Sequence, residues 1–97
     1  MSTYSTTDHP TDQARAQLAA RVSAFLDQLR REELSTIDHL RDVAARYAEP
    51  LDLSEVPDNH AGEILAQHNR RRAETLEALS GARDRLAAVN EAIEALP

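Results

Sequence analysis

Apolar residues recur at alternating spacings of four and three along two proline-free stretches, and this pattern constrains the fold more than any other feature. In the stretch before Pro50 the pattern is carried by Val22, Leu26, Leu29, Leu40, Val43 and Tyr47. In the stretch after Pro57 it is carried by Leu65, His68, Arg72, Thr75, Leu79, Ala82, Leu86, Val89, Ile93 and Leu96. A mean period of 3.5 residues is that of a coiled-coil or bundle seam, so we predict an all-α protein.

The boundaries of the two helices follow from capping and proline. Residues 1–10 are polar and predict a flexible tail. The first helix is expected over 11–49, capped by Thr11 or, alternatively, beginning from Asp8 with Pro10. Pro50 ends it, 50–57 is the connection, and the second helix is expected over 58–96. Gly81 within that helix predicts either a kink or the close approach of another backbone.

Folding the chain tightly at its connection gives an antiparallel hairpin in which residue i faces a residue numbered about 107 minus i. In this register the polar residues that interrupt the apolar seam of the first helix, Glu33 and Thr36, face those that interrupt the seam of the second helix, Arg72 and Thr75. We therefore predict a polar layer in which Glu33 pairs with Arg72 or its neighbour Arg71. The layer comprises Glu33, Thr36, Arg72 and Thr75. Polar layers of this kind fix register at some expense of stability.

The apolar face of each predicted helix is wider than one neighbouring helix can cover. Apolar side chains lie beside the seam at Phe25, Leu34, Ile37, Ile64 and Leu76, and we take them as an interaction stripe. The chain has few aromatic residues and much Ala, so the core of a lone hairpin would be thin. We expect the hairpin to be completed to a four-helix bundle by dimerisation or by a partner helix.

Charge and composition exclude several classes of function. The net charge is −6 and every basic residue is Arg. This balance argues against nucleic-acid and anionic-membrane binding, which both require a positive surface. The chain has no cysteine, which removes disulfides and thiolate chemistry. Because no apolar run is long enough to span a bilayer and the first ten residues do not resemble a signal peptide, we expect a cytoplasmic protein.

Few residues suggest chemistry. His39 and His68 approach each other in the predicted register, with Asp42 nearby, and are candidates for a metal or haem site. The Glu-x-x-His repeat of di-iron bundles is missing, so we favour solvated or seam histidines and expect no cofactor. The basic run Arg70, Arg71 and Arg72 could bind an anion, but we expect it to pair with acids of the hairpin. We expect no catalytic residue, and no enzyme.

Three functions remain compatible with the sequence. The first is a small helical adaptor or chaperone-like subunit that binds a partner protein through its apolar stripe. The second is a structural subunit that assembles with copies of itself. The third is a metal- or haem-binding bundle. The expected partner is a second copy, another helical protein, or both.

Overall fold

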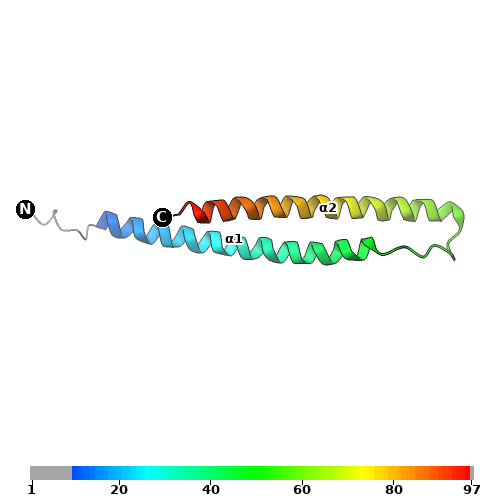
Figure 1. The fold of residues 1–97 in the computed structure, drawn as a ribbon, viewed down its shortest axis with the longest axis horizontal. Coiled ribbons are helices and arrows are strands. Elements are labelled where there is room, and N and C mark those ends of the chain that lie inside the picture. The colour runs from blue at the N-terminus through cyan, green and yellow to red at the C-terminus, as the bar shows by residue number, and fades with distance from the viewer. Residues whose placement is uncertain (1–9, 97) are drawn as a thin grey trace, which may run out of the picture.

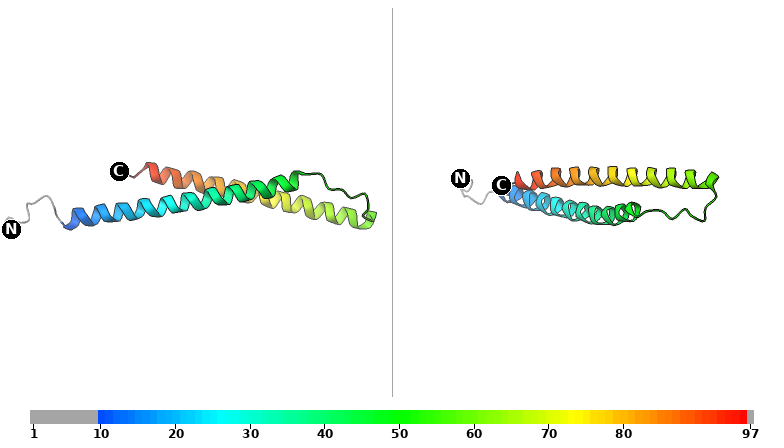
Figure 2. Two further views of the ribbon diagram at one scale, coloured as in Figure 1. Left: turned by 90° about the horizontal axis from the view of Figure 1, so that it is seen from below. Right: turned by 45° about the vertical axis from the view of Figure 1, so that its right-hand side comes forward.

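The protein is an all-α helical hairpin. In the computed structural model, which describes residues 10–96, helix α1 spans Pro10–Ala48 and helix α2 spans Asp58–Glu94. The two helices lie side by side and run in opposite directions, forming a rod 16 × 15 Å in cross-section (Figures 1 and 2). The described residues contain no strand, and neither helix has a stretch apolar enough to cross a bilayer. The all-α hairpin predicted from apolar spacing is therefore confirmed.

Helix α2 begins at Asp58 as predicted, and the other three helix ends differ from the predicted ones by one or two residues. Helix α1 begins at Pro10 rather than Thr11, because proline is well suited to the first turn, where its missing N–H would have no partner. Helix α2 ends at Glu94, where the backbone N–H of Ala95 donates to the carbonyl of Glu91. The tail predicted over residues 1–10 lies outside the described residues, except for Pro10.

The core of the described residues consists of three buried residues at the contact between the two helices. Ile37 of α1 is 5% exposed, and Leu79 and Ala82 of α2 are 6% and 0% exposed. Leu40 and Leu86 pack against this cluster. The prediction that Ile37 lies beside the seam is therefore wrong. Alternation of three and four admits either position 36 or 37 after Glu33, and burial favours the apolar Ile37 over Thr36, which is exposed.

The hairpin register is staggered relative to the predicted one. Glu33 pairs with Arg85, and Tyr47 contacts His68, so facing residue numbers add to 118 and 115 rather than 107. The connection explains the difference, because residues 49–57 run beyond the end of α1 before the chain turns into α2 (Figure 1). The predicted register instead requires the chain to turn tightly within the connection. The shift of about ten residues corresponds to roughly three helical turns, or about 15 Å.

The stagger leaves both helix N-termini without a facing helix. Leu96, near the end of α2, falls opposite about residue 21 of α1, so the first turns of α1 extend past α2 (Figure 1). All side chains over residues 11–25 are exposed. At the other end, the first turns of α2 lie beyond Ala48 and are accompanied by the connection (Figure 2). The rod is therefore two helices thick only in its middle.

Truncation of the core should destabilise the hairpin strongly. We expect Leu79→Ala to lower the free energy of unfolding by about 2–3 kcal/mol, because it removes part of a three-residue core. Leu18→Ala is the matched control, since Leu18 is 62% exposed, and its effect should be below about 0.5 kcal/mol. Urea unfolding followed by circular dichroism measures both. Equal effects would show that the Ile37–Leu79 contact is not the centre of the fold.

Gly81 causes neither of its predicted features within the described residues. Helix α2 continues through it, and a methyl group built there would meet only the Arg85 side chain, at 3.4 Å. Replacing glycine by alanine in a helix interior gains up to about 1 kcal/mol. We therefore expect Gly81→Ala to raise the melting temperature, as should Gly62→Ala, where the added carbon meets nothing within 4 Å. A lower melting temperature for Gly81→Ala alone would reveal a close neighbour at that site.

Candidate functional site: the exposed apolar stripe

Four of the five residues predicted as an interaction stripe are open to solvent. Phe25 is 63% exposed, and Leu34, Ile64 and Leu76 are 45%, 39% and 46% exposed. The fifth, Ile37, belongs to the core. Exposed large apolar side chains that the sequence did not assign to the stripe are Leu18, Val22, Leu51 and Leu65. Large exposed apolar side chains that form a contiguous patch are typical of protein–protein contact sites.

The sequence reasoning missed these additional residues because of the register. Val22 and Leu65 carry the seam spacing, and Leu18 lies beside it, so a hairpin paired along its full length would have buried them. In the staggered hairpin they lie at or near the parts of the helices that have no facing helix. The length of the connection was the signal that could have revealed this, since residues 50–57 suffice to extend past α1 by several turns.

The predicted polar layer does not form. Glu33 is half-buried on the seam, and its Oε1 accepts a hydrogen bond of 2.9 Å from Nε of Arg85. Its other oxygen, Oε2, is buried without a hydrogen-bond partner. Thr75 donates its hydroxyl to the carbonyl of Arg71 on the same helix, and Arg72 and Thr36 are exposed. The pairing of Glu33 with Arg72 is therefore wrong, because the stagger moves Arg72 towards the end of α1.

The end of α1 is closed by a histidine from α2. Nε2–H of His68 donates to the carbonyl of Tyr47 over 2.9 Å, and the two rings meet edge to face with centroids 5.2 Å apart. The last carbonyls of a helix have no partner within it, so His68 satisfies one of them. This contact occupies Nε2 of His68. It also places His39, eight residues before Tyr47, about 12 Å away along α1.

The candidate metal or haem site is not assembled. The stagger separates His39 from His68, and Asp42 is exposed on α1. Within residues 10–96, no group of three His, Cys, Asp or Glu side chains is placed to hold a metal ion. Nothing in the geometry of the hairpin therefore favours the metal-binding hypothesis.

The basic run makes no ion pair within residues 10–96, contrary to the expectation that it pairs internally. Arg70, Arg71 and Arg72 are all exposed. The ion pairs of the described residues involve other arginines. Arg30 and Arg31 both bind Asp27 on α1, the former over 2.7 Å, and Arg85 binds Glu33.

The connection is ordered locally by Asp52. Its Oδ1 accepts hydrogen bonds from the hydroxyl and the backbone N–H of Ser54, at 2.6 and 3.1 Å. These bonds favour the ionised form and lower the pKa of Asp52 below its ordinary value. The turn is therefore held when Asp52 is ionised and weakens as the pH falls through that lowered pKa.

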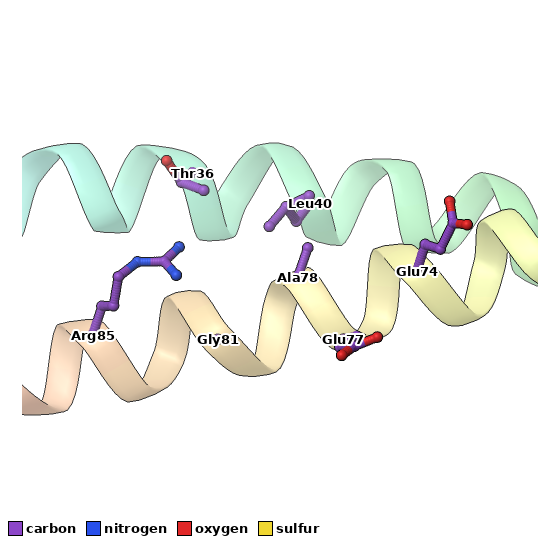
Figure 3. Close-up of a pocket in the computed structure, with 7 residues that line it drawn as sticks. All are labelled: Thr36, Leu40, Glu74, Glu77, Ala78, Gly81 and Arg85. Atoms are coloured by element: carbon purple, nitrogen blue, oxygen red, sulfur yellow. The ribbon is translucent and has the colours of Figure 1, made fainter.

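A shallow groove runs between the helices next to the core (Figure 3). Leu40 and Ala78 approach each other at its centre, Gly81 leaves space beside them, and Arg85 lies at one end. The full lining is Thr36, Leu40, Glu74, Glu77, Ala78, Gly81 and Arg85. Its charged side chains are Glu74, Glu77 and Arg85, and Arg85 is already paired with Glu33.

Comparison with known proteins assigns no family, since no family model, curated protein or solved structure matches the chain.

The ion pair between Glu33 and Arg85 provides a test of the register. In a double-mutant cycle with Glu33→Gln and Arg85→Gln, we expect a coupling free energy of about 0.5 kcal/mol, the range of partly exposed ion pairs. The matched cycle of Glu33→Gln with Arg72→Gln should show no coupling. Unfolding free energies from urea titrations supply both values. Coupling to Arg72 rather than Arg85 would restore the unstaggered register.

Proposed function

We propose that the protein is a non-enzymatic interaction module, a small helical adaptor or chaperone-like subunit that binds another protein through its exposed apolar stripe. One observation carries this proposal: within residues 10–96, the hairpin buries only three residues in its core and leaves eight large apolar side chains exposed. A partner that covers these side chains would enlarge the small core of the hairpin.

Site-specific photo-crosslinking in cells tests this proposal. A photoreactive amino acid replaces Phe25 or Leu76 on the stripe, and Asp42 or Asp84 at exposed control positions. We expect a discrete adduct with another protein at the stripe positions and none at the controls, because buried contacts form only where the apolar side chains lie. Equal labelling of stripe and control positions would overturn the proposal.

A second candidate function, a self-assembling structural subunit, is favoured by the stagger. The first turns of α1 extend past α2 and carry Leu18, Val22 and Phe25 at spacings of four and three. Such a segment can pair with its equivalent in a second copy around a twofold axis. In this case the crosslinked adduct would contain two copies of the chain.

Light scattering distinguishes the two candidates in solution. For a self-assembling subunit, the wild-type chain is at least a dimer, and Leu18→Ser with Phe25→Ser lowers its mass to that of a monomer without loss of helix. For an adaptor, the wild-type chain is monomeric at tens of micromolar and the double variant has the same mass. Leu34→Ser with Leu76→Ser is the matched control, since it changes two equally apolar side chains outside that segment.

A further inference from the structure

An internal repeat surrounds the two core residues Ile37 and Leu79. The segments 30–41 and 72–83 share Arg, Glu, Leu and Arg at their first, third, fifth and twelfth positions, and Ile37 and Leu79 are the eighth. The repeat therefore places the same side chains at the same distances along the chain from each core residue. The shared arginines and leucines form two triads, Arg30, Leu34 and Arg41 on α1, and Arg72, Leu76 and Arg83 on α2.

Both triads lie on one side of the hairpin. Successive residues of a helix are rotated by about 100°. The three members of a triad lie seven and three residues before the core residue and four residues after it, so all three are rotated from it by roughly 20–60° in the same direction. Two antiparallel helices are related by a local twofold axis perpendicular to them. Because Ile37 and Leu79 share the core, equal offsets from them fall on the same side of the pair. We call this surface the arginine–leucine face.

The two triads alternate along the face. In the observed register Leu34 lies across from Arg83, and Leu76 lies across from Arg41. Leu34 and Leu76 are therefore separated along the rod by about 11 Å, roughly two helical turns. Both are nearly half exposed. The aliphatic stems of arginine extend such an apolar surface while the guanidinium groups rim it.

The charge of this face is opposite to that of the whole chain. The net charge is −6, yet Arg41, Arg72 and Arg83 are exposed and make no ion pair within residues 10–96. Arg30 is held by Asp27. The shared acids of the repeat, Glu32 and Glu74, lie five residues before the core residues, which places them about 140° round in the other direction.

Asp38 is the nearest remaining acid of the repeat, one residue after Ile37 and about 100° round, at the outer edge of the face. The face is consequently an apolar strip rimmed by three arginines that make no ion pair within residues 10–96, with Asp38, Asp42 and Asp84 at or beyond its outer edge. Two such faces would repel each other, which disfavours a symmetric contact between copies through it.

We propose that the arginine–leucine face binds an acidic amphipathic helix of a partner protein. This inference rests on the proposed function and names the chemistry of its partner. Apolar residues seven apart on the partner rise about 10.5 Å, so one covers Leu34 and the other Leu76. Glu or Asp residues that flank them meet Arg41, Arg72 and Arg83. The arginine–carboxylate pairs formed there are desolvated by the contact and favour binding.

Peptide binding to the full chain tests the proposal. The probe is a fluorescent 21-residue helical peptide, stapled on its outer face, with Leu seven residues apart and Glu on both flanks. A second peptide carries Lys in place of every Glu. We expect the Glu peptide to bind with an affinity that falls as salt rises, and the Lys peptide to bind at least about tenfold more weakly, a difference of about 1.4 kcal/mol.

Paired variants locate the site. Arg41→Glu with Arg83→Glu should weaken the Glu peptide at least about tenfold and strengthen the Lys peptide. The matched control is Arg21→Glu with Arg70→Glu, which changes the net charge equally at exposed positions away from the face, and it should change either affinity less than about twofold. Leu34→Ser with Leu76→Ser should weaken the Glu peptide while circular dichroism shows the hairpin intact.

Four results would overturn the proposal. Equal binding of both peptides would make the contact apolar without charge selection. Binding of neither peptide would remove the site. Equal binding of a single-stranded DNA oligonucleotide, dependent on Arg41 and Arg83 but not on Leu34 and Leu76, would assign the face to a polyanion. If the Arg41→Glu, Arg83→Glu variant, and no other variant, had a lower mass by light scattering than the wild-type chain, the face would be assigned to contact with a second copy. None of these results removes the crosslinking expected of an interaction module, so the two proposals fail separately.

Discussion

The contact of Ile37 with Leu79 and Ala82 determines the rest of the structure. Two helices side by side can bury only one stripe each, and within residues 10–96 only one residue of α1 and two of α2 are fully buried. The pairing of Glu33 with Arg85 lies on one side of that contact along the rod, and the closing of α1 by His68 lies on the other. Little apolar surface is buried between the helices, so the exposed apolar side chains characterise this hairpin as much as the buried ones do.

The sequence predicted the helices and their seam well because both depend on local periodicity. Most of the predicted seam of α2 is buried or half-buried, namely His68, Thr75, Leu79, Ala82, Leu86, Val89, Ile93 and Leu96, whereas its members Leu65 and Arg72 are exposed, as is Val22 of α1. The register was not predictable in the same way. It depends on the path of residues 49–57, and spacing says nothing about whether a connection turns tightly or runs on.

The stagger of about ten residues also explains why most of the predicted seam residues lie between the helices although the predicted register is wrong. Ten to eleven residues are close to three repeats of a 3.5-residue period, so sliding one helix by that amount returns the same stripe to the same neighbour. What changes is which side chains meet within the stripe. Apolar periodicity therefore predicts faces, whereas specific polar pairs such as Glu33 with Arg85 fix position along the axis. The interaction stripe was predictable as a face for the same reason, and Ile37 was misplaced only because positions 36 and 37 are equally periodic.

The repeat around Ile37 and Leu79 makes the middle of the rod nearly the same when viewed from either end. A helix that turned end over end on the arginine–leucine face would find leucine and arginine in almost the same places. Direction would then be set by what breaks the symmetry, namely Asp27 holding Arg30 at one end and the exposed Leu65 beyond Arg72 at the other. On the proposed face, binding of a partner helix and the choice of its direction would therefore depend on different residues.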